Sequence, residues 1–223
     1  MKLAPTLHTH GSVSGVQGVR ILKVLARDEA LSGRFPLSNV LIWKDRLEGA
    51  AGSIDAANSP PSDGITVTAL RDAETVQAGD VIRLRQGGTL VSVLFRRGSR
   101  SNTLFVTEQC NSFCLMCSQP PRDEDDRWRL GELHALIKLI DPTEEQIGVT
   151  GGEPTLLGAD LGILLASARR SLPETHLHVL TNGRRFADAE LAKLLIGAGG
   201  QQTTWAVPLY GDVAAVHDEI VAS

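Results

Sequence analysis

The chain has 223 residues, of which 42% are hydrophobic and 22% charged, and its mean hydropathy is -0.01. This balance is typical of a folded globular protein with one large or two small domains, and it excludes an extended disordered chain. A net charge of -4 gives no basic footprint, so we expect no nucleic acid partner. Apolar runs such as 161–166 fall far short of the roughly 20 residues of a membrane helix, so we expect a cytoplasmic protein without a membrane partner.

Short β-like runs separated by turn residues occupy the first hundred positions. Five runs are expected as strands: Val19 to Leu25, Val40 to Trp43, Ile65 to Leu70, Val81 to Arg85, and Leu90 to Phe95. The last two flank Gly87-Gly88, which predicts a hairpin with a tight turn. Residues 1–100 are therefore expected to form a small β-rich N-terminal domain.

Two polar segments of this domain are expected to lack regular structure. Residues 49–64 are rich in Ala, Gly, Ser, Asn and Pro, which predicts a loop. Arg96, Arg97 and Arg100 form a short basic run before the cysteines. We interpret this run as a solvated linker, with a contact to an acidic peptide or a phosphate as the alternative.

From Asn102 onward, β-rich and helical patterns alternate. Strands are expected at 103–107, 146–150, 176–180 and 203–209, and helices at 127–140, from a cap at Asp160 to Pro173, and at 187–198. Repeated β-α units predict a parallel sheet with right-handed crossovers. Functional residues should then gather at the carboxyl ends of the strands in this second domain, residues 101–223.

Each strong motif follows one of these strands. They are E-Q-C-N-S-F-C-L-M-C-S-Q-P-P from Glu108, Gly151-Gly152-Glu153-Pro154, Thr181-Asn182-Gly183, and Pro208-Leu209-Tyr210-Gly211. The first motif holds all three cysteines of the chain, Cys110, Cys114 and Cys117. An odd number of clustered cysteines without an export signal argues against a disulfide framework and for metal or redox chemistry.

The cysteine spacing favours an iron–sulfur cluster over zinc. A structural zinc site normally uses four ligands, and the nearest candidate for the fourth, His134, lies on a predicted helix beyond an acidic loop. An iron–sulfur cubane held by three thiolates leaves one iron open to a small-molecule ligand. The amino and carboxylate groups of S-adenosylmethionine (SAM) can chelate such an iron, and an electron from the cluster can then cleave the sulfonium C–S bond.

The G-G-E-P motif is suited to bind the amino group of such a ligand. Gly151-Gly152 lets bare backbone approach the ammonium group of such a ligand, and Glu153 offers a carboxylate of opposite charge. Pro154 fixes the loop as it leaves the strand. Alone, the motif reads as an ordinary strand-to-helix turn, but one β-α unit after C-x3-C-x2-C it becomes specific.

With these motifs the sequence resembles the radical SAM enzymes, and more narrowly the radical SAM maturases of the His-Xaa-Ser peptide-modification system. The narrower resemblance is carried by C-N-S-F-C-L-M-C-S-Q-P-P, I-G-V-T-G-G-E-P-T-L-L-G, H-V-L-T-N-G-R-R-F and V-P-L-Y-G-D-V-A-A-V-H-D. It covers residues 102–221, and segment 79–95 is also similar. The resemblance implies a [4Fe–4S] cluster on Cys110, Cys114 and Cys117, and a 5'-deoxyadenosyl radical made from SAM. It also implies a ribosomally made precursor peptide as substrate, a companion radical SAM maturase and an electron donor.

Cofactor contacts are expected beyond the cysteines. The resemblance implies methionine-amino contacts at Gly151, Gly152 and Glu153, and we group Pro154 with them. Met116 precedes the third cysteine, where the superfamily often has an aromatic residue near the adenine, and could pack there. Asn182 is a candidate nucleoside contact, although turn geometry alone explains an Asn-Gly at a strand end. We assign no catalytic acid, base or nucleophile.

Other polar residues have plain structural interpretations. The acidic run 123–126 is expected to be a solvated loop, with a contact to a basic or His-containing peptide as the alternative. His217-Asp218 is either a family-like functional pair or an exposed pair in the first turn of a helix. His176 and His178 alternate within a strand and are interpreted as structural.

The expected fold class is α/β: a parallel partial (β/α) barrel of the radical SAM type, preceded by the β-rich domain. Only about four β-α units fit after Asn102, whereas the radical SAM core resembles a six-stranded partial barrel. We therefore expect a truncated core with an unpaired strand edge. Three functions remain open: a radical SAM peptide maturase, a non-catalytic remnant that binds the peptide or the companion enzyme, and a radical SAM enzyme with another substrate.

Overall fold

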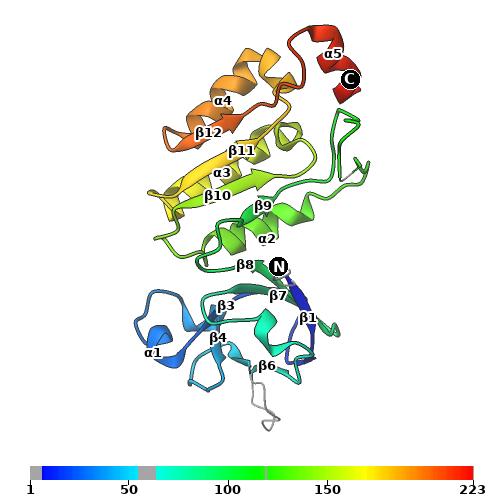
Figure 1. Cartoon of the computed structure of the whole chain (residues 1–223). Helices are drawn as coiled ribbons and strands as arrows, with labels where there is room; N and C mark the ends of the chain where they lie inside the picture. The colour runs from blue at the N-terminus through cyan, green and yellow to red at the C-terminus, as the bar shows by residue number, and fades with distance from the viewer. Residues whose placement is uncertain (1–6, 55–63, 119, 223) are drawn as a thin grey trace. The chain divides into compact units, whose positions relative to one another are not determined.

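The computed structural model describes residues 7–54, 64–118 and 120–222. The chain divides into two compact units between Ser99 and Arg100. Figure 1 draws the first unit in blue to green and the second in green to red. None of the helices in the described ranges is long and apolar enough to span a membrane.

The first unit is built on one mixed sheet of eight strands in the order β1-β8-β7-β3-β4-β5-β6-β2. The strands are β1 (His8–His10), β2 (Ser12–Ser14), β3 (Val19–Leu25), β4 (Val40–Trp43), β5 (Gly52–Ile54), β6 (Ile65–Thr68), β7 (Val81–Arg85) and β8 (Leu90–Phe95). The two edge strands β1 and β2 are separated in sequence only by Gly11, so one bent segment brings the two ends of the sheet together. The sheet is therefore nearly closed, around a core that includes Leu22, Leu41 and Ile82.

The predicted hairpin is confirmed, because β7 and β8 pair antiparallel. The predicted loop over 49–64 is wrong at Gly52–Ile54, which forms β5, while residues 55–63 lie outside the described residues. A Cβ on Gly52 would overlap the backbone of Ile65 on the parallel strand β6. Glycine here permits close packing of two strands, although glycine-rich composition is typical of loops.

The prediction of a solvated linker is wrong at Arg96 and Arg97, which form ion pairs, whereas Arg100 is exposed. Arg96 is paired with Asp80, with 3.0 Å between Nη2 and Oδ2, and it also donates to the carbonyl of Thr75. Arg97 pairs with Glu29 on α1 (Arg27–Ala30) at 2.5 Å. Because the Asp80 side chain is only 1% exposed, its carboxylate requires a buried partner, and the run supplies one.

The second unit contains a four-stranded sheet in the order β12-β11-β10-β9, in which every pairing is parallel. Its strands are β9 (Thr103–Phe105), β10 (Gln146–Thr150), β11 (His176–Leu180) and β12 (Thr203–Ala206). Its helices are α2 (Trp128–Ile137), α3 (Ala159–Ser171), α4 (Ala189–Gly199) and α5 (Ala214–Val221). The prediction of an α/β protein with a parallel sheet is confirmed.

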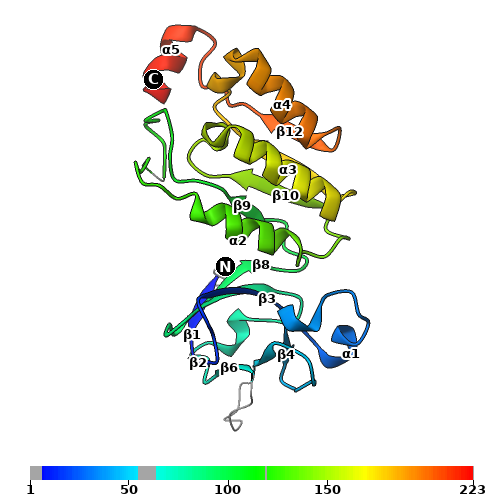
Figure 2. The same cartoon turned by 180° about the vertical axis from the view of Figure 1, so that it is seen from behind.

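Helices α2, α3 and α4 cover one face of this sheet, as the front view and the view from behind agree (Figures 1 and 2). Ile147, Val149 and Leu177 are fully or nearly fully buried, whereas the alternating His176 and His178 are half-buried. The period of two along each strand therefore separates a helix-covered apolar face from a polar one. On the polar face, a hydrogen bond of 2.9 Å joins Nε2 of His176 to Oγ1 of Thr204.

Several element ends differ from the predictions. Asp160 does not cap α3: Gly158, at φ 56°, holds the N-cap position, because Pro154–Leu157 already forms a 3-10 turn. Helix α4 begins after Asp188, whose side chain accepts hydrogen bonds from two backbone N–H groups of the first turn. Strand β12 ends at Ala206 instead of residue 209, because Pro208 has no N–H to extend the ladder.

Candidate cofactor site

The cysteine loop, residues 108–122, leaves the carboxyl end of β9 and is fastened at its base by Asp126. This carboxylate accepts hydrogen bonds from Oγ1 of Thr107 at 3.0 Å and from the N–H of Glu108 at 2.7 Å. Arg122 N–H donates to the Glu108 carbonyl at 3.1 Å and closes the loop on itself. Asp126 is only 6% exposed, so the prediction of a solvated acidic run is wrong at this residue.

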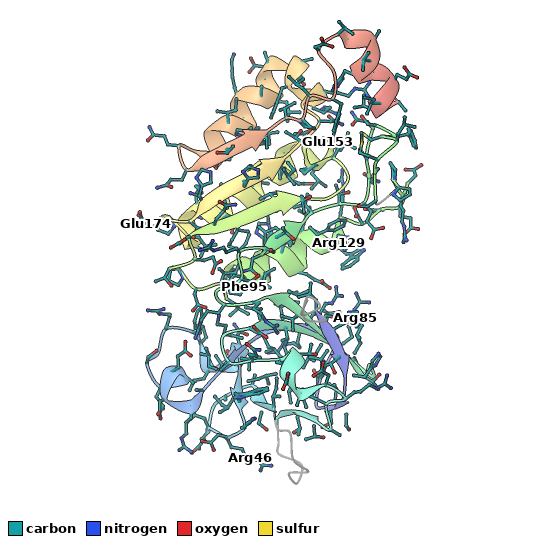
Figure 3. The ribbon with its side chains drawn as sticks, viewed as in Figure 1. Arg46, Arg85, Phe95, Arg129, Glu153 and Glu174 are labelled. Carbon is teal, nitrogen blue, oxygen red and sulfur yellow. The ribbon has the colours of Figure 1, made fainter. Side chains whose placement is uncertain are left out.

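Arg129 on α2 completes the base of the loop. Its Nε lies 3.2 Å from Oδ2 of Asp126, and its Nη2 donates to the Glu108 carboxylate. The guanidinium also lies over the rings of Phe105 and Trp128, 5.2 and 4.7 Å from their centroids. Figure 3 labels this side chain beside the sheet. Together these contacts join β9, the cysteine loop and the start of α2.

Glu153 lies directly after β10 and is 1% exposed (Figure 3). Its Oε1 accepts from the N–H of Thr155 (2.9 Å), from Oγ1 of Thr155 (2.6 Å) and from Oγ1 of Thr181 (2.7 Å). Its Oε2 accepts from the N–H of Asn182 at 2.6 Å. Four donors offset the cost of burying the carboxylate, and they join the end of β10 to the end of β11.

The two glycines before Glu153 allow close packing against the start of the cysteine loop. Gly152 N–H donates to the Thr107 carbonyl and Glu153 N–H to the Gln109 carbonyl, both at 2.7 Å. A Cβ on Gly151 would overlap Thr107, and one on Gly152 would overlap Gln109. The glycines therefore let the G-G-E turn and the cysteine loop share a surface, with φ at Gly151 of 153°.

The turn after β11 braces the cysteine loop from the side. Nδ2 of Asn182 donates to Oδ1 of Asn111 at 2.7 Å and to Oγ of Ser112 at 3.2 Å. Nη1 of Arg184 donates to the carbonyl of Asn111 at 2.5 Å. The Asn182 amide, which the sequence suggested for the nucleoside, thus holds the segment between Cys110 and Cys114.

Helix α5 meets the same loop from another side. The N–H groups of Phe113 and Leu115 donate to the carbonyls of Val221 and Ile220, at 3.2 and 3.0 Å. These bonds satisfy carbonyls at the C-terminal end of the helix, which have no partner inside it.

His217 lies in the middle of α5 and stacks on Tyr210, with ring centroids 5.9 Å apart and planes at 21°. Tyr210 N–H donates to Nδ1 of His217 at 3.3 Å. His217 is half-buried and Asp218 is exposed, and both line the cavity described next, so the description as an exposed pair is wrong only at His217.

A cavity of about 710 Å³ opens where these elements converge. Its lining includes Cys110, Cys114, Met116, Cys117, Gly151, Gly152, Glu153, Thr181, Asn182, Arg184, Val207, Tyr210, His217 and Asp218. Of the predicted cofactor residues, only Pro154 does not line the cavity; it is buried at the first position of the 3-10 turn. The main residue that sequence reasoning missed is Arg184, although its place directly after T-N-G at a strand end was a usable signal.

All three cysteines are free thiols, and Cys117 is exposed. Burial raises the pKa of the Cys110 thiol, and the negative charges of Glu153 and Cys114 raise it further, while the N–H groups of Ser112 and Asn111 act in the opposite direction. Within the described ranges, no three His, Cys, Asp or Glu side chains converge on one ion position. Three free thiols on one cavity fit the ligand set of an iron–sulfur cluster.

A parallel α/β unit with three free thiols and a G-G-E turn on one cavity defines a cofactor-binding domain at the carboxyl ends of the strands. A family model described as the Radical SAM superfamily matches residues 104–221, which is more than half of the chain. The chain therefore belongs to the radical SAM superfamily. This membership implies an enzyme class that uses an iron–sulfur cluster and SAM. No curated protein matches the sequence, and the narrower resemblance to the His-Xaa-Ser maturases stays a prediction.

Proposed function

We propose that this chain holds a [4Fe–4S] cluster on Cys110, Cys114 and Cys117 and reductively cleaves SAM. One observation carries the proposal: the three free thiols line the same cavity as Gly151, Gly152 and Glu153. These groups come from different β-α units, so the fold itself brings the two halves of the radical SAM signature together.

Residues around the cysteine loop support this function because they fix the position of the loop. Asp126 fixes the base of the cysteine loop, and Asn182 and Arg184 brace its middle, so the loop is held from two sides. When bound, the cluster supplies the electron that cleaves the sulfonium C–S bond of SAM.

Glu153 supports the proposal as an acceptor for the methionine ammonium group. Its Oε1 accepts three hydrogen bonds within the described residues, whereas Oε2 accepts one, from Asn182. A carboxylate oxygen has about two lone-pair sites, so Oε2 keeps capacity for an ammonium donor.

For the substrate, we propose a ribosomally made peptide of the His-Xaa-Ser type, modified together with a companion radical SAM maturase and an electron donor. The support is the resemblance carried by the four sequence motifs. Large apolar side chains also stand exposed beside the cavity motifs: Leu209 is 82% exposed, Leu115 76% and Phe113 67%. Such side chains suit contact with a peptide better than contact with a small polar metabolite.

The test is anaerobic reconstitution of the whole chain with iron and sulfide, followed by SAM and dithionite. We expect a [4Fe–4S] spectrum and formation of 5'-deoxyadenosine, measured by liquid chromatography and mass spectrometry. Cys114→Ala should lose both, while Leu115→Ala, an exposed neighbour, should keep both. A cluster that forms without SAM cleavage would reject catalysis by this chain and favour a role in binding only.

The substrate class has a separate test. The reconstituted chain is incubated with a peptide that contains His-Xaa-Ser repeats, with and without the companion maturase, and the peptide mass is followed. A mass change that depends on SAM supports the peptide assignment. Cleavage of SAM with an unchanged peptide under both conditions would reject it and leave a radical SAM enzyme with another substrate.

A further inference from the structure

Arg184 lies on the cavity wall, in the turn that follows β11, and no cofactor contact is predicted for it from the sequence. We propose that its guanidinium binds the α-carboxylate of the methionine moiety of SAM, while Glu153 binds the ammonium group. The proposal rests on the proposed function, because it requires that SAM occupies this cavity. It adds the residue that recognises the second charge of the ligand.

The charges around the cavity support this assignment. Among the described residues that line it, Arg184 is the only lysine or arginine, whereas Glu153 and Asp218 are carboxylates. Three cysteine thiolates add further negative charge once they act as ligands. An ionised carboxylate entering such a cavity needs an opposite charge to offset repulsion and lost solvation. Arg184 is the residue that offers it.

The Arg184 guanidinium is held in place by one hydrogen bond, and its other N–H donors are not used by it. Its Nη1 donates to the Asn111 carbonyl at 2.5 Å, and the backbone N–H of Arg184 donates to Oδ1 of Asn182 at 3.1 Å. A guanidinium has five N–H donors in a rigid fork that matches a carboxylate. Within the described residues, the contact to the Asn111 carbonyl uses only Nη1 of Arg184. Nη2 and Nε therefore remain for a ligand. The α-carboxylate of SAM could accept hydrogen bonds from this fork.

Asn182 fixes the guanidinium relative to the Glu153 carboxylate. Its backbone N–H donates to Oε2 of Glu153 at 2.6 Å, and its side chain donates to Oδ1 of Asn111 at 2.7 Å. Asn111 in turn holds Arg184 through its carbonyl. A negative and a positive group thus stand in one hydrogen-bonded frame, as recognition of an α-amino acid end requires, since its ammonium and carboxylate share one carbon.

Binding measurements test the assignment without relying on turnover. The cluster-reconstituted, unreduced chain is dialysed to equilibrium against SAM and against decarboxylated SAM, which lacks the carboxylate. For Arg184→Gln we expect the affinity for SAM to fall about 10- to 100-fold, the range of a charged hydrogen bond, with little change for decarboxylated SAM. Arg185→Gln is the matched control, because Arg185 is also exposed but does not line the cavity, and it should change neither affinity.

Arg184→Lys covers the case in which the glutamine variant fails to fold or to assemble its cluster. It keeps the charge but loses the fork, so a smaller loss limited to SAM is expected. If Arg184→Gln lowered the affinities for SAM and decarboxylated SAM equally, the proposal would be overturned, and Arg184 would only position the cysteine loop. Unchanged SAM affinity would overturn it as well. A wild-type chain that binds no SAM overturns the proposed function itself, which separates that failure from a failure at Arg184.

Discussion

The backbone N–H of Asn182 donates to Oε2 of Glu153 at 2.6 Å, and this contact joins the ends of β10 and β11 beneath the cavity. The same Asn182 uses its side-chain amide to hold Asn111 in the cysteine loop. Glu153 is therefore a structural centre of the site as well as the proposed ammonium acceptor. Changes at its contacts should alter stability and cluster assembly together.

Replacing Glu153 with glutamine should destabilise the second unit. The amide would place N–H donors where the carboxylate now accepts, and buried hydrogen bonds to a charged group contribute about 1.5–3 kcal/mol each. We expect the free energy of unfolding to fall by about 2 kcal/mol or more in urea titrations followed by circular dichroism. Glu174→Gln, at an exposed position, should change it by less than about 0.5 kcal/mol. Equal effects of the two variants would contradict the structural role of Glu153.

Asp126→Ala should release the base of the cysteine loop. It removes the acceptor for Thr107 and Glu108 and leaves Arg129 with one carboxylate partner fewer. We expect a loss of about 1–3 kcal/mol in stability and faster proteolysis within residues 108–122 of the cluster-free chain. Asp123→Ala, in the same acidic run but exposed, is the control. Identical cleavage rates for both variants would mean that Asp126 does not hold the loop.

The thiol of Cys110 should react slowly with iodoacetamide in the cluster-free chain. Burial, and then the charges of Glu153 and Cys114, raise its pKa above the ordinary value of 9.0, so less thiolate is present at about pH 8. We expect exposed Cys117 to be alkylated first, and the Cys110 rate to keep rising above pH 9.0. Peptide mass spectrometry over a pH series measures both. A Cys110 rate that levels off below pH 9.0 would contradict the raised pKa.

In the first unit, Arg96→Met should leave the Asp80 carboxylate without its arginine partner. The Asp80 side chain is 1% exposed, and the remaining described contact of its carboxylate is the hydrogen bond of 2.9 Å from Gln77 N–H. Breaking a buried pair by removing one partner typically costs about 3–5 kcal/mol, so a marked fall in the urea midpoint is expected. Arg100→Met, at an exposed position, should leave the midpoint unchanged. A midpoint that Arg96→Met does not move would show that Asp80 finds another partner.

Local patterns in the sequence predicted nine of the twelve strands in the described residues and missed β1, β2 and β5. The bounds of β10 and β11 agree with the predicted runs, because a buried parallel strand between turn residues has a strong local signal. The cysteine and G-G-E motifs were equally visible, and the parallel topology brings them to one edge of the sheet.

What the sequence could not indicate depends on contacts between distant segments. The burial of Asp126 depends on Thr107, which lies 19 residues earlier, so the acidic run looked uniformly solvated. β5 was hidden in glycine-rich sequence because Gly52 serves a close strand contact. The position of Arg184 after T-N-G placed it at the edge of the sheet, but the sequence could not show that it is the single permanent cation among the described lining residues. Local composition indicates which segments are exposed to solvent, whereas the roles of Asp126, Gly52 and Arg184 depend on contacts with residues distant in sequence.

The most direct test of the proposed function is 5'-deoxyadenosine formation by the anaerobically reconstituted chain, with SAM and dithionite present. We expect product that requires both SAM and reductant, no product from Cys114→Ala, and wild-type amounts from Leu115→Ala. A wild-type chain with an intact [4Fe–4S] cluster that forms no 5'-deoxyadenosine would contradict the proposal that this chain cleaves SAM.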